Sequence, residues 1–138
     1  MKSYIAAYAV TALIFLGLDA VWLSTMAKLL YRPLLGDMMM EKPSLAPAIA
    51  FYILYIGGIV FFVTAPALET GRWTTALLRG AIFGLVAYAT YDLTNMATLK
   101  NWSPIVTWAD LVWGTFATSA AATLGYLVVV SVLKLGRN

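Results

Sequence analysis

Four apolar stretches, each long enough to cross a lipid bilayer, constrain the fold of this sequence most. They cover residues 4–25, 48–68, 73–99 and 105–135. A helix rises about 1.5 Å per residue, so crossing a bilayer core takes about 20 residues. Only 11% of the residues are charged, against about 25% in soluble domains, and these are too few to cover a soluble surface. We therefore predict an all-α, polytopic membrane protein, a bundle of four transmembrane helices.

The connections between the stretches predict how the helices are joined. Residues 69–72 and 100–104 form short links, so the helices that they join should be antiparallel neighbours. Residues 26–47 form a long link in which charged and apolar residues alternate around Pro33 and Gly36. We interpret this link as an interfacial, amphipathic segment that continues the first helix and is broken at Pro33 and Gly36. A lid over a binding site is the alternative. Residues 1–138 are taken as one integral membrane domain.

Two absent residue types narrow the chemistry. The sequence contains neither cysteine nor histidine, which excludes hydrolases with a cysteine or histidine in the catalytic group and any iron–sulfur cluster. Zinc and copper sites lose their usual ligands as well, so we predict no metal site and no cofactor. The net charge of +3 is small and fits the cationic flanks of membrane spans. It does not indicate nucleic-acid binding.

Three carboxylates inside the apolar stretches are the strongest functional signal. Asp19 and Asp92 lie near the ends of the first and third stretches, and Asp110 lies near the start of the fourth. Because successive spans alternate in direction, all three should lie at similar depth, toward the side opposite the termini. An acidic residue at the bilayer centre costs roughly 2.5–3.5 kcal/mol, and less near the interface. The candidate charge partners near that side are Lys28, Arg32 and Lys100.

The neighbours of these carboxylates extend the candidate site. A residue with an N–H donor follows each aspartate at the third position, which lies on the same helical face. A tyrosine precedes the second aspartate by four residues. The predicted ligand-binding residues are Asp19, Trp22, Tyr88, Asp92, Asn95, Asp110 and Trp113. Three other interpretations stay open: helix capping by Asp110, structural salt bridges, and an interfacial tryptophan belt.

Small residues recur at every fourth position of the last stretch and predict close helix packing. They form two stripes: Gly114, Thr118 and Ala122, and Ala117, Ala121 and Gly125. Packing within the bundle is one interpretation. A homodimer through the fourth helix is the other.

Three segments carry a resemblance to a known family. Residues 91–102 read Tyr-Asp-Leu-Thr-Asn-Met-Ala-Thr-Leu-Lys-Asn-Trp, and residues 18–23 and 108–114 surround the other two aspartates. Together they resemble the bacterial membrane family called domain of unknown function 2177 (DUF2177), over essentially the whole chain. The resemblance implies a predicted membrane protein of the bacterial inner membrane with no assigned activity. It also implies that the aspartates and Asn95 belong to the family's pattern.

Three functional hypotheses of different classes follow. The first is binding or transport of a small cationic or lipid-like ligand at the carboxylate, amide and indole pocket. The second is a lipid-active membrane enzyme or its subunit. The sequence lacks the aspartate-rich and histidine-rich motifs of such enzymes, and whether the chain is an enzyme stays open. The third is a non-catalytic accessory or scaffold protein. The lipid bilayer is the expected partner, and the distribution of lysine and arginine favours cytoplasmic termini.

Overall fold

The computed structural model describes residues 1–136, and its regular structure is entirely helical, with no strand in that range. The first span contains α1 (Lys2–Met26), η1 (Ala27–Tyr31), α2 (Arg32–Leu35) and η2 (Gly36–Met38). The second contains α3 (Leu45–Ile59), η3 (Val60–Thr64) and α4 (Ala65–Thr70). The third is α5 (Trp73–Thr98), and the fourth contains α6 (Pro104–Leu127) and η4 (Val128–Val132). All four are long and apolar enough to cross a membrane, which confirms the predicted fold class.

The helix ends differ most from the predicted ranges at the first span. Helical turns extend from Lys2 to Met38, over 37 residues, far beyond the residues 4–25 assigned from hydropathy. The regular geometry breaks at Gly36, where φ is 55°. A bilayer core takes about 20 residues of helix. The last turns of this helix therefore extend beyond the core. An irregular stretch, residues 39–44, then leads into α3. The fourth span ends at Val132, three residues before its predicted end.

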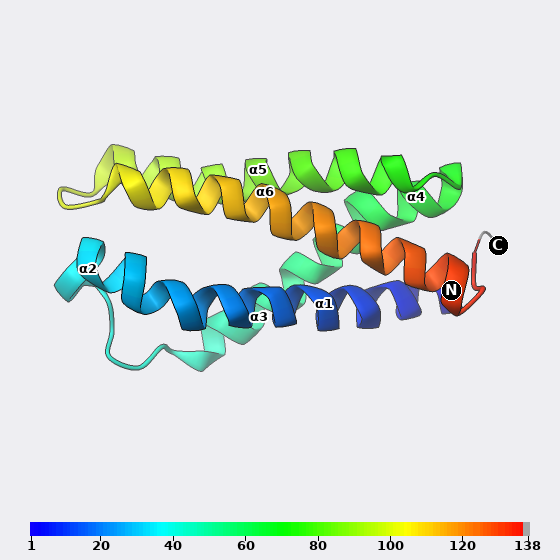
Figure 1. Ribbon diagram of the computed structural model, residues 1–138, viewed down its shortest axis with the longest axis horizontal. Coiled ribbons are helices and arrows are strands. Elements are labelled where there is room, and N and C mark those ends of the chain that lie inside the picture. The colour runs from blue at the N-terminus through cyan, green and yellow to red at the C-terminus, as the bar shows by residue number, and fades with distance from the viewer. Residues whose placement is uncertain (137–138) are drawn as a thin grey trace.

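The first, third and fourth spans lie along one common long axis (Figure 1). α5 and α6 form a long antiparallel hairpin, and α1 runs beside them. The second span crosses the bundle obliquely: α3 lies near α1, whereas α4 lies beside α5 (Figure 1). The start of α1 and the end of the fourth span lie at one end of the bundle, which we call the terminal end. The opposite end, formed by α2 and the α5–α6 turn, is called the far end.

The α5–α6 hairpin is packed through glycines. A Cβ atom on Gly84 would overlap the carbonyl oxygen of Gly114, and one on Gly80 would lie 2.8 Å from the Cα of Ser119. Gly125 in turn packs against Thr11 of α1. All six residues of the two predicted stripes are buried inside the chain. The interpretation as intramolecular packing therefore accounts for both stripes, and neither is left on the surface for the predicted homodimer.

Two prolines explain the wide, π-helical turns of the first and second spans. Pro33 and Pro66 each follow such a turn, η1 or η3, by two residues. A proline ring clashes with the carbonyl four residues earlier, which lies inside the turn, and widening the turn relieves the clash. Proline also lacks an N–H, so the carbonyl of Phe62 loses its donor. The guanidinium of Arg79 on α5 donates to that carbonyl at 3.4 Å, which gives an intramembrane arginine a structural role.

Candidate functional site

Asp19 lies at the centre of a polar cluster where three spans meet. The carboxylate is 8% exposed. It accepts a hydrogen bond from the Tyr52 hydroxyl of α3 and another from the Trp113 indole N–H of α6, at 3.2 Å. Each carboxylate oxygen therefore has a donor from a different helix. Asp19 joins the first, second and fourth spans through these bonds.

A second set of contacts extends this cluster to Asp110. The indole of Trp22 stacks on that of Trp113, with 4.5 Å between ring centroids and 9° between planes. The Trp22 N–H donates to the Tyr31 hydroxyl at 2.8 Å, and that hydroxyl donates to the Asp110 carboxylate. A continuous path of stacked rings and hydrogen bonds thus joins Asp19 to Asp110. We call this path the aspartate–aromatic network.

Asp92 differs from the other two aspartates because no hydrogen bond satisfies it. Its side chain is completely buried, and neither carboxylate oxygen has a hydrogen-bond partner among residues 1–136. Its side chain neighbours that of Asp110, but two ionised carboxylates offer each other only acceptors, so a hydrogen bond between them requires a proton on one of the two. The Thr107 hydroxyl, which accepts a 2.8 Å bond from the Trp102 indole, approaches only the Asp92 backbone carbonyl, at 3.5 Å. A buried carboxylate without a donor is expensive, so this group needs a partner from outside the chain or a proton.

Asp110 lines two cavities at the far end, whereas Asp92 lines neither. The larger cavity, called the end cavity, has a volume of about 430 Å³. Side chains from the last part of the first span and from the α5–α6 hairpin line it. These include Tyr31, Met38, Met39, Asn95, Trp102 and Asp110. The smaller, called the side cavity, has a volume of about 300 Å³ and is lined by Phe51, Ala87, Tyr88, Tyr91 and Asp110. Both volumes fall in the range of roughly 300–1,000 Å³ typical of small-molecule sites.

The structure brings most of the predicted ligand-binding residues together. Asp19, Trp22, Asp110 and Trp113 belong to the aspartate–aromatic network, and Asp92 lies behind Asp110. Asn95 and Tyr88 line the two cavities, one each. The shared helical face does not decide where the indole N–H groups point, however. The Trp22 N–H points to Tyr31 and not to the aspartate one turn earlier, and the Trp113 N–H binds Asp19 of another helix.

The three candidate charge partners lie elsewhere. Lys28, Arg32 and Lys100 are all exposed, and the donors that reach Asp19 and Asp110 are phenols and an indole. Among residues 1–136 the acidic side chains form no cluster of three that could hold a metal ion. Neutral phenol and indole donors therefore hold the polar site together. Within residues 1–136, no lysine or arginine side chain donates to the carboxylates of Asp19 or Asp110.

Comparison with known families identifies the chain. The family model described as "Predicted membrane protein (DUF2177)" matches residues 4–127. The chain belongs to this family. Membership confirms the resemblance drawn from the three aspartate segments, and it agrees with the four spans. No curated protein and no solved structure matches the chain.

Two tyrosines of the site escaped the sequence analysis. Tyr31 was placed in the interfacial link and Tyr52 in an apolar stretch, with no pattern that relates either to an aspartate. The available signal was weak: a phenol in a membrane span needs a hydrogen-bond partner. In this chain the partners are Asp110 for Tyr31 and Asp19 for Tyr52.

Proposed function

We propose that this membrane protein binds an amphipathic cation, an apolar molecule with a protonated amine, in the end cavity against Asp110 and Asp92. The observation that carries the proposal is the buried, unsatisfied carboxyl group of Asp92 beside the cavity-lining Asp110. An ammonium group offers up to three N–H donors and a positive charge. It would supply what the two carboxylates lack.

The lining of the end cavity supports an apolar body on the ligand. Met38 and Met39 contribute flexible thioethers, which adapt to varied apolar shapes. Tyr91 and Trp102 present aromatic rings, packed edge to face at 5.8 Å between centroids. Ring faces attract ammonium groups as well as hydrocarbon. Cavities that bind such ligands combine a mostly apolar wall with a few placed polar groups.

The last part of the first span, from η1 to η2, supports the alternative role of a lid. Tyr31, Leu35, Met38 and Met39 all line the end cavity and all belong to η1–η2 or the residue after it. The lid is held in place through the bond from the Tyr31 hydroxyl to Asp110. A ligand that reaches Asp110 would compete with this hydroxyl, so binding and lid position would be coupled.

Asp19 has a different role in this proposal. Because both of its oxygens already have donors from other helices, it acts as a brace between spans. The scaffold interpretation of the sequence thus applies to Asp19, and the ligand-binding interpretation applies to Asp92 and Asp110. The proposed orientation keeps both termini in the cytoplasm of a bacterium and opens the end cavity to the outer side of its inner membrane.

Binding of dodecylammonium to the protein in lipid nanodiscs tests the proposal. Wild type should bind the amine and not dodecanol, which has the same chain without the charge. Asp110→Asn and Asp92→Asn should each weaken binding at least about tenfold, since removing one partner of a buried charge pair costs 2–5 kcal/mol. Asp37→Asn, at an exposed acidic residue of η2, is the matched control. Equal binding by all four proteins, or of amine and alcohol, would refute the proposal.

A further inference from the structure

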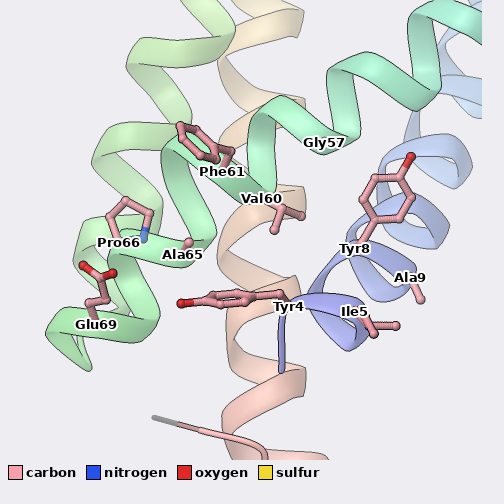
Figure 2. A pocket seen from close by; sticks show the side chains of 10 residues that line it. All are labelled: Tyr4, Ile5, Tyr8, Ala9, Gly57, Val60, Phe61, Ala65, Pro66 and Glu69. Carbon is pink, nitrogen blue, oxygen red and sulfur yellow. The ribbon is translucent and has the colours of Figure 1, made fainter. Parts of the chain in front are cut away.

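A third and larger cavity lies at the terminal end, away from the three aspartates. Figure 2 shows it between the start of α1 and the η3–α4 part of the second span. Its volume is about 820 Å³, and we call it the lateral groove. Its lining is almost entirely hydrocarbon and aromatic. The residues used below are Tyr4, Tyr8, Gly57, Phe61, Pro66 and Glu69.

The oblique second span creates this groove. The Tyr8 hydroxyl donates to the Ile53 carbonyl at 3.0 Å and holds α1 against α3. Beyond this bond the second span passes through the wide turn η3 and Pro66, and α4 lies beside α5 instead of α1 (Figure 1). The two spans therefore separate toward the terminal end. The space between them lies within membrane-spanning segments, where the surrounding solvent is lipid.

One acidic side chain stands at the edge of the groove. Glu69 is the only acidic residue in the part of the chain at the terminal end, because Asp19, Asp92 and Asp110 belong to the far-end site and Asp37 and Glu41 to the far-end link. Figure 2 shows Tyr4 lying across the groove with its hydroxyl directed toward the α4 side, where Glu69 lies. The groove thus combines an apolar interior with an anionic and a phenolic group at its aqueous edge.

We propose that the lateral groove binds an aminophospholipid, with one acyl chain between α1 and the second span and its primary ammonium group at Glu69. Charge complementarity selects this occupant. Lys2 and Arg72 stand two and three residues from Tyr4 and Glu69, so cations for the lipid phosphate are present at the same end. A primary ammonium donates hydrogen bonds to a carboxylate. The quaternary ammonium of phosphatidylcholine has no N–H to donate, and phosphatidylglycerol has no cation.

Glycine substitutions test the groove itself. A Cβ on Gly57 would meet only the Tyr8 ring edge, at 3.9 Å, so a side chain there enters the groove without a clash at its base. Gly57→Leu should fill the space for the acyl chain and reduce lipid retention about tenfold or more. Gly17→Leu is the matched control, because a Cβ on Gly17 meets nothing within 4 Å and lies on an exposed face of α1.

Native mass spectrometry of protein released from nanodiscs provides the readout. The nanodiscs contain equal amounts of phosphatidylethanolamine, phosphatidylcholine and phosphatidylglycerol with the same acyl chains. Wild type should retain phosphatidylethanolamine preferentially. Glu69→Gln should reduce that preference up to about fivefold, the scale of an exposed ion pair, whereas Glu41→Gln at the far end should not change it.

The outcomes separate this site from the end cavity. Asp110→Asn should retain the phospholipid like wild type, even if it loses dodecylammonium. Retention that is equal in wild type and Gly57→Leu would overturn the groove as the binding site. Retention without preference among the three headgroups, or a preference for phosphatidylglycerol, would overturn the role of Glu69.

Discussion

The indole rings of Trp22 and Trp113 lie face to face, 4.5 Å apart between centroids and nearly parallel at 9°. One ring belongs to α1 and the other to α6, and each uses its N–H for a different polar group: Tyr31 for Trp22 and Asp19 for Trp113. The stack therefore connects two hydrogen-bonded clusters that share no direct bond. It is the middle of the path between Asp19 and Asp110.

This stack should appear as a coupling energy. Aromatic pairs contribute about 0.5–1.5 kcal/mol beyond the apolar area that they bury. We expect a double-mutant cycle with Trp22→Leu and Trp113→Leu to give a coupling of this size in equilibrium unfolding from mixed micelles. Trp73 and Trp108, both exposed on different helices, provide the control pair. Additive effects of the first pair would show that the two rings do not stabilise each other.

Asp19 and Asp92 should respond in opposite ways to the same substitution. An asparagine at position 19 keeps one acceptor but turns an amide donor toward one of the two donors, Tyr52 or Trp113. Asp19→Asn should therefore lower the free energy of unfolding by about 1–3 kcal/mol. Asp92→Asn breaks no hydrogen bond and removes a buried carboxyl group without a donor, so stability should be unchanged or higher.

Thermal unfolding of both variants in nanodiscs measures this contrast. A loss at position 92 as large as that at position 19 would assign Asp92 to bracing and would weaken the proposed ligand site. The difference also tests a general expectation: residues kept for function reduce stability, whereas residues kept for structure do not.

The sequence predicted the spans and the shared depth of the aspartates because both follow from length and alternation alone. The apolar residues must match the bilayer, and successive spans must reverse direction. It did not predict the partners of the indoles. Helical spacing relates Trp22 to Asp19, but the rotation of α1 against α6 decides which aspartate an indole reaches, and this depends on packing between helices.

The π-helical turns limited the prediction in a second way. The sequence predicted breaks at Pro33 and Gly36. The structure continues the helix past Pro33 by widening the turn before it, and the helical geometry breaks at Gly36, where φ is 55°. This wide turn carries Tyr31 to Trp22 and Asp110. A sequence pattern based on 3.6 residues per turn cannot place a side chain beyond such a turn.

Gly84 should tolerate no side chain. A Cβ there would overlap the Gly114 carbonyl oxygen and lie 2.8 Å from Thr118, and backbone cannot move aside as a flexible side chain can. Gly84→Ala should lower the free energy of unfolding by about 1–3 kcal/mol. The matched control, Gly17→Ala, meets nothing within 4 Å and should raise stability slightly, because alanine is the better helix former. If the two variants unfold alike, the close α5–α6 contact is wrong.

The absence of cysteine in the sequence makes the proposed orientation simple to measure. Asn101→Cys places one thiol in the α5–α6 turn at the far end, and Thr74→Cys places one at the start of α5, at the terminal end; both positions are exposed. A membrane-impermeant maleimide should label position 101 in cells with a permeable outer layer and an intact inner membrane. Position 74 should react only after the inner membrane is opened. The reverse labelling would place the termini outside and turn the end cavity toward the cytoplasm.

Tyr31 should hold the lid closed over Asp110, and its hydroxyl alone can be removed. Tyr31→Phe eliminates the bond to Asp110 and the acceptor for the Trp22 N–H, so the lid loses two hydrogen bonds while its aromatic ring remains. If an ammonium ligand competes with this hydroxyl, the variant should bind dodecylammonium about two- to tenfold more tightly, the scale of one net hydrogen bond. Tyr91→Phe, on the same cavity wall but without a hydrogen bond to Asp110, is the control and should show no such gain. Unchanged or weaker binding by Tyr31→Phe would mean that the hydroxyl does not compete with the ligand, and the lid would then have no part in ligand entry.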